Sequence, residues 1–362
     1  MTLVWQLSGS AVTSAGRRQQ ELADRVAEYS GGKVQLELYF GNALVGAADA
    51  ADALGDGRLD LHLLRPQLQP ADFPVSGRIV PEATTTRPTA FVSGQLAMYG
   101  ALNEALLSEP ALQAEYDARG LTVLIPAPEQ PVTVIACSEP APSLAALAGR
   151  QIRVESAEAT AQVESLGLTA VTIAPGELYE AVQRGIVDCI VTGFAQHAGL
   201  VEFMPHLMVP VGASLVQQGT GIELAGYRWA ELPLTVRQLL YDQLSELHLA
   251  ALPGLLDTGR SVVEAAEAAG GGVVPFEEDV NEALRAYNAR VVASWSQSPL
   301  LDGEAFRGRL EAAYARWSAF LDRSGVPDVE LADVNGWNDA TVGWDAFLDA
   351  YREQLVVPNR PG

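Results

Sequence analysis

The sequence predicts a two-lobed α/β fold in which each lobe is a β-sheet flanked by helices. The stretch from Arg150 to Val191 alternates apolar strands with helices, and the stretch from Val34 to Leu63 repeats that order, with GRLDLHLL mirroring GIVDCIV. Two similar units predict two lobes facing each other across a cleft, with a ligand at the carboxyl ends of the strands. Helix, glycine and apolar strand also recur in α/β proteins with one sheet, so the pattern alone leaves both architectures open.

The first unit is predicted element by element from its apolar spacing. Leu3 to Trp5 start a first strand, and alternating apolar residues from Val34 to Phe40 predict a second. A helix from Ala47 to Leu54 ends in the segment GDG, and the next strand runs from Leu59 to Leu63. The chain therefore follows a βαβ path here.

The second unit contains the same succession of elements. Strands are predicted at 151–154 and 168–173, with a helix from Ala159 to Leu166 between them. A helix opened by Pro175 ends at Gly185, and the next apolar strand is interrupted by Asp188. Asp188 and its counterpart Asp60 are expected to accept backbone N–H bonds and hold loops, since a short carboxylate does this readily.

The C-terminal third is predicted to be helical. A long helix from Leu232 to about Ala269 is broken at Pro253 and Gly254. Apolar spacing then predicts two amphipathic helices, carried by Leu284, Tyr287, Val291 and Trp295 and by Phe306, Leu310, Tyr314, Trp317 and Leu321. We expect a helical cap packed on the lobes; a surface for homodimer formation is the alternative.

Composition and charge exclude several classes of function. The chain has 362 residues, 23 basic and 45 acidic, which gives a net charge of -22, and Lys33 is its only lysine. A nucleic-acid partner is not expected, because phosphate backbones require a basic face. No apolar run approaches the roughly 18 residues that a spanning helix needs. No export signal is recognisable before the first strand, so export cannot be inferred from the residues themselves.

Catalytic and metal-binding motifs are not recognised in the chain. Cys189 and His197 could serve as nucleophile and base, but a lone cysteine near a histidine is more often part of the packing. Both cysteines, Cys137 and Cys189, lie in apolar strands and are expected to be free buried thiols, although a disulfide is conceivable in an oxidising compartment. We expect no cofactor and no metal, and the spacing of the histidines does not indicate zinc.

Five segments, in order, resemble a known family of transport proteins. SGGKVQLELYFGNALVG, ALGDGRLD, LAGRQIRV, GLTAVTIAPGELYEAVQRGIVD and YRWAELPLTVRQLLYDQL are similar to the solute-binding proteins of tripartite ATP-independent periplasmic (TRAP) transporters of the DctP-like type. The resemblance covers Leu3 to Phe276 and implies a periplasmic-binding-protein fold with a long bracing helix. It implies lobe I at 1–125 and about 212–250, lobe II at 126–211 and about 251–276, and a helical region at 277–362.

Arg153, at the tip of an apolar strand, is the residue on which the functional hypothesis depends. A guanidinium matches a carboxylate in two parallel hydrogen bonds, which fixes both the charge and the orientation of a ligand. In the family the arginine of the KxRV-like segment is the partner of the ligand's carboxylate, and Arg153 matches it. The alternative is a strand-edge arginine paired with a nearby acid such as Glu155.

Other pocket positions are carried over from the family or chosen for their chemistry. Ser8 matches a polar position, with Ser10 close by; Arg65 stands where sialate-binding members place an acid, and Thr192 where many members have asparagine. These departures, with the absence of an arginine in EQPVTVIACS, argue against sialic acid. Apolar or polar contributions to the pocket are expected from Phe194, Trp5, Gln218 and Thr220.

The expected function is capture of a small organic acid between the lobes and its delivery to a TRAP-type membrane permease, outside the cytoplasm. The resemblance, and not the composition, supplies the permease partner and the compartment. An ABC-type solute receptor is the nearest alternative, although a lipid-attachment cysteine near the N-terminus would favour it and none is present. An enzyme on a two-lobed fold is the alternative from another class. The oligomeric state is left open between monomer and homodimer.

Overall fold

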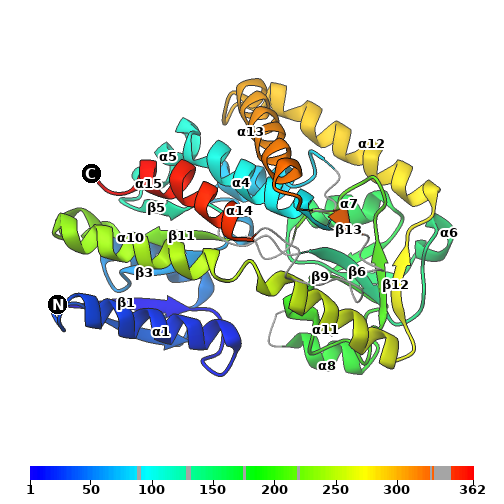
Figure 1. The fold of residues 1–362 in the computed structure, drawn as a ribbon. Coiled ribbons are helices and arrows are strands. Elements are labelled where there is room, and N and C mark those ends of the chain that lie inside the picture. The colour runs from blue at the N-terminus through cyan, green and yellow to red at the C-terminus, as the bar shows by residue number, and fades with distance from the viewer. Residues whose placement is uncertain (88–90, 128–131, 174–176, 218–220, 327, 330–343) are drawn as a thin grey trace.

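The computed structural model describes residues 1–362 except 88–90, 128–131, 174–176, 218–220, 327 and 330–343. Two large sheets flanked by helices lie side by side in Figure 1. The first has five strands in the order β2-β1-β3-β11-β5 and comprises β1 (Thr2–Leu7), β2 (Gln35–Phe40), β3 (Leu61–Leu64), β5 (Thr122–Ile125) and β11 (Ile222–Ala225). This arrangement confirms the prediction of a two-lobed α/β fold.

The second sheet has six strands in the order β12-β10-β6-β9-β7-β8. They are β6 (Thr133–Cys137), β7 (Gln151–Arg153), β8 (Thr169–Val171), β9 (Cys189–Gly193), β10 (His206–Val209) and β12 (Gly272–Pro275). The chain passes from the first sheet to the second between β5 and β6, returns between β10 and β11, and crosses again before β12.

Four neighbouring strands have the same arrangement in both sheets, which accounts for the internal repeat in the sequence. In the first sheet β1 runs parallel to both β2 and β3, and β3 is antiparallel to β11. In the second sheet β7 runs parallel to both β8 and β9, and β9 is antiparallel to β6. The strands predicted from GRLDLHLL and GIVDCIV, β3 and β9, are therefore equivalent inner strands of their sheets.

Helices cover the first sheet on both faces. On one face α1 (Ser14–Tyr29) and α10 (Leu234–Leu249) pack their buried leucines and valines against Leu3 and Trp5 of β1. The other face, which presents Leu64 and Leu224, belongs to a larger core. That core includes α2 (Ala50–Asp56), α3 (Ser76–Ala83), α4 (Ser93–Leu107) and α5 (Pro110–Asp117), with the short helices η1 (Ala47–Asp49), η2 (Pro66–Leu68) and η4 (Tyr227–Glu231) in the connections.

The second sheet is covered in the same way. One face, which carries Ile135, Ile152 and Val191, packs against α6 (Leu144–Leu147), α7 (Ala157–Ser165) and α12 (Glu278–Ser294). The opposite face, which carries Val134 and Ile190, packs against α8 (Leu178–Gln183), α9 (Phe194–His197) and α11 (Gly254–Ala268). Alternate residues of β7 and β9 thus face different helical layers, as the period of a strand requires.

The predicted long helix is divided where the sequence placed its break. Helix α10 ends at Leu249 and α11 begins at Gly254, immediately after Pro253. Because α10 packs on the first sheet and α11 lies beside β12 of the second, the broken helix connects the two lobes (Figure 1).

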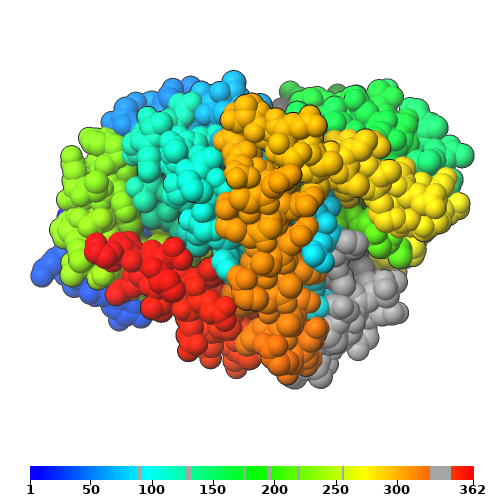
Figure 2. Space-filling model, turned by 90° about the horizontal axis from the view of Figure 1, so that it is seen from above, coloured from blue at the N-terminus to red at the C-terminus, as the bar shows by residue number. Residues whose placement is uncertain are grey.

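Both predicted amphipathic helices are present in the C-terminal region. Helix α12 is followed by η5 (Trp295–Gln297) and then by α13 (Gly303–Arg323), which lies across α4 on the face shown in Figure 2. The Trp317 ring of α13 sits directly over Gly100 of α4, so close that a Cβ at Gly100 would lie 2.6 Å from it. The remaining elements are a small sheet of β4 (Phe91–Val92) with β13 (Asp328–Val329), and α14 (Trp344–Tyr351), η8 (Arg352–Val356) and α15 (Val357–Asn359).

The expectation of two free thiols is wrong. Cys137 of β6 and Cys189 of β9 are directly opposed in the antiparallel ladder, with their Cα atoms 4.1 Å apart, and they form a disulfide. Strand register places them opposite each other, and register between strands that are distant in sequence is not visible in local periodicity. Within the described part of the chain, no helix is long and apolar enough to cross a membrane.

Candidate functional site at the carboxyl ends of β7 and β9

Arg153 is the last residue of β7, at the carboxyl end of that strand. It pairs with Ile190 of β9 on one side and with Val171 of β8 on the other. Its neighbour Ile152 points into the core under α7 and α12, so Arg153 lies on the opposite face of the sheet. The residue is only 4% exposed. A buried guanidinium needs partners, because desolvation of a charge is costly.

The guanidinium of Arg153 contacts polar atoms on two sides. Its Nη1 donates to Oε1 of Glu155 over 2.7 Å, and Nε and Nη2 both donate to the carbonyl oxygen of Ile173, over 3.4 and 3.3 Å. The pair with Glu155 is the alternative that the sequence left open, and the structure contains it. Its short distance is typical of a charge-assisted bond, whereas the two bonds to Ile173 are long.

Thr192 and Phe194 lie close to Arg153 in the sheet. Thr192 is two residues beyond Ile190 in β9, on the same face as Arg153; it is 6% exposed and its hydroxyl donates to the carbonyl of Gly193. Phe194 begins α9 and is buried, with its ring beside Gly259 of α11. The structure therefore places the predicted residues Arg153, Thr192 and Phe194 at the carboxyl ends of two neighbouring strands, β7 and β9, in the second sheet.

The predicted residues of the first lobe follow β1 and β3, again at carboxyl ends. Ser8 is exposed and its hydroxyl donates to Oδ1 of Asn42 over 3.3 Å. Ser10 is exposed in the turn before α1, where its carbonyl accepts from Thr13. Arg65 is half-buried between β3 and η2. Each sheet thus presents predicted polar residues at the ends where ligands of open α/β sheets bind.

Other predicted positions lie elsewhere. Trp5 is fully buried in the core between β1 and the helices α1 and α10, so its role in the structure is packing, and the expectation that it lines a ligand wall is not supported by its position. Alternation in a strand leaves open which face is the core, which is why the sequence could not place this ring. Gln218 and Thr220 lie outside the described residues.

Sequence reasoning did not identify two residues that have buried polar atoms near these ends. Thr133 opens β6 opposite Gly193, and its Oγ1 is buried without a hydrogen-bond partner among the described residues. Gln6 of β1 is fully buried: its Oε1 accepts from the backbone N–H groups of Leu44 and Val45, and its Nε2 donates to the Val45 carbonyl. Gln6 thereby orders the loop that follows β2. An isolated polar residue in an apolar strand is the only signal the sequence offers for either.

The residues considered for an enzyme do not form a reactive pair. Cys189 is bonded to Cys137, so it has no thiol to act as nucleophile. His197 is fully buried, and burial lowers its pKa to about 4, while its Nε2 lies 3.0 Å from the carbonyl oxygen of Met204. A neutral imidazole that donates to a backbone carbonyl is part of the packing of α9. Among the described residues, no cluster of three or more His, Cys, Asp or Glu could hold a metal ion.

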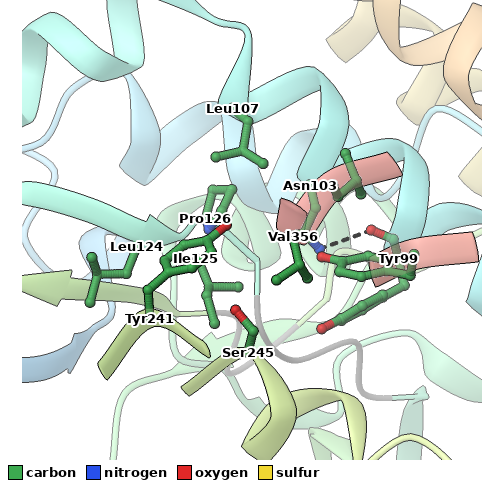
Figure 3. A pocket seen from close by; sticks show the side chains of 11 residues that line it. Tyr99, Asn103, Leu107, Leu124, Ile125, Pro126, Tyr241, Ser245 and Val356 are labelled. Atoms are coloured by element: carbon green, nitrogen blue, oxygen red, sulfur yellow. Dashed lines mark hydrogen bonds between the residues drawn. The ribbon is translucent and has the colours of Figure 1, made fainter. Parts of the chain in front are cut away.

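A small cavity in the first lobe does not fit an organic acid. It encloses about 10 Å³, close to the space of one water molecule. Figure 3 shows Tyr241 and Ser245 of α10 pointing toward it, with Asn103 of α4 and Val356 of the C-terminal segment around it. The Asn103 amide donates to the Tyr99 carbonyl, as drawn there. This cavity is a packing defect between α4, β5 and the C-terminal helices.

A larger hollow lies beside α12 and α13. It has a volume of about 330 Å³ and is lined by residues that include Arg285, Arg307 and Ser214. Both arginines already have acidic partners: Arg285 contacts Glu278, and Arg307 lies 3.7 Å from Glu311. Both arginines are also substantially exposed, so solvent would screen their attraction for an anion. We therefore assign no function to this hollow.

Comparisons with known proteins agree with this architecture. Residues 9–298 match the model of the family described as bacterial extracellular solute-binding protein, family 7. An extracytoplasmic solute receptor from Bordetella pertussis that binds pyroglutamic acid superposes with a TM-score of 0.69 at 17% identity, covering 87% of this chain and 99% of the receptor. A TRAP periplasmic solute-binding protein from Desulfovibrio salexigens with bound orotic acid gives 0.70 at 18% identity, with coverages of 87% and 99%.

A third structure comes from a marine metagenome and is a TRAP solute-binding protein specific for aromatic acid ligands, in complex with 3-hydroxybenzoate. It gives a TM-score of 0.69 at 19% identity and covers 88% of this chain and 98% of that protein. Such distant likenesses show the fold, and the family match extends over most of the chain. Together they confirm the resemblance found in the sequence: the chain belongs to family 7 of the bacterial extracellular solute-binding proteins, the TRAP solute-binding proteins.

Proposed function

We propose that this protein is an extracytoplasmic receptor that captures a small organic acid between its lobes and delivers it to a TRAP-type membrane permease. The observation that carries the proposal is Arg153, a guanidinium held at the carboxyl end of an inner strand and almost fully buried. Solvent exclusion makes a charge-assisted bond to this group strong, on the order of 1.5 to 3 kcal/mol. The structural relatives with bound pyroglutamate, orotate and 3-hydroxybenzoate support an acid as the class of ligand.

The surrounding residues have the chemistry that such a site needs. Thr192 lies on the same face as Arg153, and Thr133 contributes a buried hydroxyl on the neighbouring strand β6. From the first lobe we propose Arg65, Ser8 and Ser10 as contributors, since they follow the strands equivalent to β7 and β9. A few polar groups that converge from two lobes fix the orientation of a ligand.

We also propose the lobe boundaries stated from the sequence, with lobe I at 1–125 and about 212–250 and lobe II at 126–211 and about 251–276. The strands support them: β5 ends at Ile125, and β11, which returns to the first sheet, begins at Ile222. At one crossing the hydroxyl of Ser214 donates to the Arg87 carbonyl over 2.5 Å, and the Gln217 N–H donates to Oγ1 of Thr84 over 3.3 Å. A motion of one lobe relative to the other would bend the chain at these crossings.

The test is a binding screen of the parent protein and Arg153→Ala against pyroglutamate, orotate, 3-hydroxybenzoate and simple dicarboxylates. Thermal shift provides the first readout and calorimetry the second, because a ligand that binds only the native state must raise the melting temperature. We expect at least one acid to stabilise the parent and the variant to lose that shift while it stays folded. Equal shifts in both proteins would refute the role of Arg153, and recovery of a chemically altered acid would indicate an enzyme.

A further inference from the structure

The contacts of Arg153 imply more than an anchor for a carboxylate. We propose that Glu155 is an internal competitor for the ligand: it holds the guanidinium that an incoming acid needs, and the acid binds by displacing it. This inference rests on the proposed function. It makes Glu155 a residue that sets the affinity of the site.

Glu155 and Ile173 accept hydrogen bonds from two sides of the guanidinium of Arg153. A bidentate carboxylate needs two adjacent N–H groups of the fork. On one side Nη1 is taken by Glu155 over 2.7 Å, and on the other Nε and Nη2 share the carbonyl oxygen of Ile173. Three of the five N–H groups are thus engaged, so a ligand that forms two parallel bonds either takes the Nε and Nη2 pair from Ile173 or bonds Nη1 beside the Glu155 carboxylate.

Electrostatics decides which contact is replaced. The carbonyl of Ile173 is neutral, whereas Glu155 carries a charge that balances the arginine. If Glu155 stayed in place when a ligand carboxylate bound, two carboxylates would share one guanidinium whose side chain is 5% exposed, and the charge around Arg153 would be net negative. Like charges this close raise each other's energy strongly in a poorly solvated environment. Exchange of one carboxylate for the other keeps the charge balanced.

The side chain of Glu155 takes no part in the cap of the helix that follows it. It lies just beyond the end of β7 and before α7, whose first turn is capped by Ser156 through a bond from the Ala159 N–H to the Ser156 hydroxyl. Its side chain is 20% exposed, so a rotation would carry the carboxylate toward water. The backbone and the cap can stay in place while the side chain turns.

The exchange lowers the affinity of the site by the same factor for every acid that binds Arg153. A ligand gains a bond to Arg153 only after the bond to Glu155 is lost, so its apparent affinity falls by the fraction of molecules in which the guanidinium is available. An acid with nothing but a carboxylate gains little from a like-for-like exchange. A ring or a further polar group has to supply the remaining affinity.

The test compares Glu155→Gln with the parent by calorimetry, using pyroglutamate, orotate, 3-hydroxybenzoate and acetate as probes. The variant keeps the size of the side chain and removes its charge. Glu164→Gln is the matched control, because Glu164 is an exposed acid on α7 of the same lobe. We expect Glu155→Gln to bind at least one ring acid about tenfold more tightly than the parent, a factor that corresponds to about 1.4 kcal/mol, and to bind acetate more tightly by a similar factor. Glu164→Gln should bind like the parent.

The outcomes separate this inference from the proposed function. Acids that bind the parent and Glu155→Gln equally well, or the variant more weakly, would overturn the competition and leave the acid receptor intact. If neither protein binds any of the acids, the proposed function fails and the competition fails with it. Circular dichroism and the melting temperature establish that the variant is folded. Glu155→Ala, which removes the competing oxygens altogether, gives a second measurement and should tighten binding at least as much.

Discussion

Asp60 and Asp188 make the same contact in the two lobes. Oδ2 of Asp60 accepts the Val4 N–H over 2.8 Å, and Oδ2 of Asp188 accepts the Gln151 N–H over 2.8 Å. In each case the aspartate's own N–H donates back to the carbonyl of the same partner, over 2.8 and 2.9 Å. Each aspartate directly precedes an inner strand, β3 or β9, and fixes it against the parallel neighbour. The expectation that both accept backbone N–H bonds is confirmed, but the N–H groups belong to strands β1 and β7 and not to loops.

Removal of these carboxylates should cost stability in a defined order. Asp188→Ala leaves the Gln151 N–H to exposed surroundings, where water can replace the bond, so we expect a loss of about 0.5–1.5 kcal/mol in the free energy of unfolding. Asp60→Ala should cost more, because Asp60 is buried and also pairs with Arg228 over 3.1 Å. Asp188→Asn keeps an acceptor oxygen and serves as the control. Urea denaturation measures all three, and a larger loss for Asp188→Ala than for Asp60→Ala would contradict the assignment.

The repeat could be predicted from sequence because its signals are local. Alternating apolar residues, a glycine that ends a helix and an aspartate before a strand are all visible within a few residues, and β3 and β9 follow from them. Register is a different matter. Pairing of Cys137 with Cys189 depends on how β6 meets β9, strands that are separated in sequence by β7 and β8, and no local pattern fixes that meeting.

For the candidate site too, the sequence identified residues from local signals and missed those that depend on how strands pair. Arg153 stands out as an arginine at the tip of an apolar strand, and Glu155, two residues further along the chain, is its partner. Trp5 lies in a core, and alternation does not say which side of β1 that core is on. The buried hydroxyl of Thr133 could not be foreseen either, because its burial depends on the strand paired with it.

Loss of the disulfide should weaken the second lobe. Cys137 and Cys189 close a loop with a sequence separation of 52, and in the chain-entropy view such a cross-link stabilises by on the order of 2–4 kcal/mol through the unfolded state. The double variant Cys137→Ala with Cys189→Ala should therefore unfold at lower urea than the parent. A reductant should lower the midpoint of the parent and leave that of the variant unchanged. Two titratable thiols in the native, non-reduced parent would contradict the pairing.

A methyl group at Gly100 should disturb the seating of α13 on α4. The added Cβ would meet the Trp317 ring at 2.6 Å, and that ring cannot easily move, because its Nε1 donates to Glu104 and the ring packs on Phe347. We expect Gly100→Ala to lower the free energy of unfolding by about 1–3 kcal/mol, the usual cost of overpacking, despite the better helix propensity of alanine.

Tryptophan fluorescence during urea denaturation measures the effect at Gly100, and Gly308→Ala is the control. Gly308 lies in α13 itself, and a Cβ there meets no atom within 4 Å. The control should therefore be neutral or stabilising. Equal effects of the two substitutions would show that Trp317 does not fix the crossing of α13 over α4.

Acid should destabilise the protein partly through His197. Burial lowers the pKa of this imidazole from 6.5 to about 4, so below pH 6.5 the unfolded chain binds a proton that the native state resists. The contribution of this group to the free energy of unfolding is complete above pH 6.5. It is lost progressively as the pH falls toward 4, by up to about 3 kcal/mol. His197→Gln keeps a donor for the Met204 carbonyl, which accepts from His197 over 3.0 Å, but it does not titrate. The difference in the free energy of unfolding between parent and variant should therefore shift in favour of the variant between pH 6.5 and 4.

Urea denaturation at several pH values measures this difference, and taking the difference cancels the other titrating groups. A difference that stays constant over this range would show that the imidazole takes up its proton in the native state as readily as in the unfolded chain.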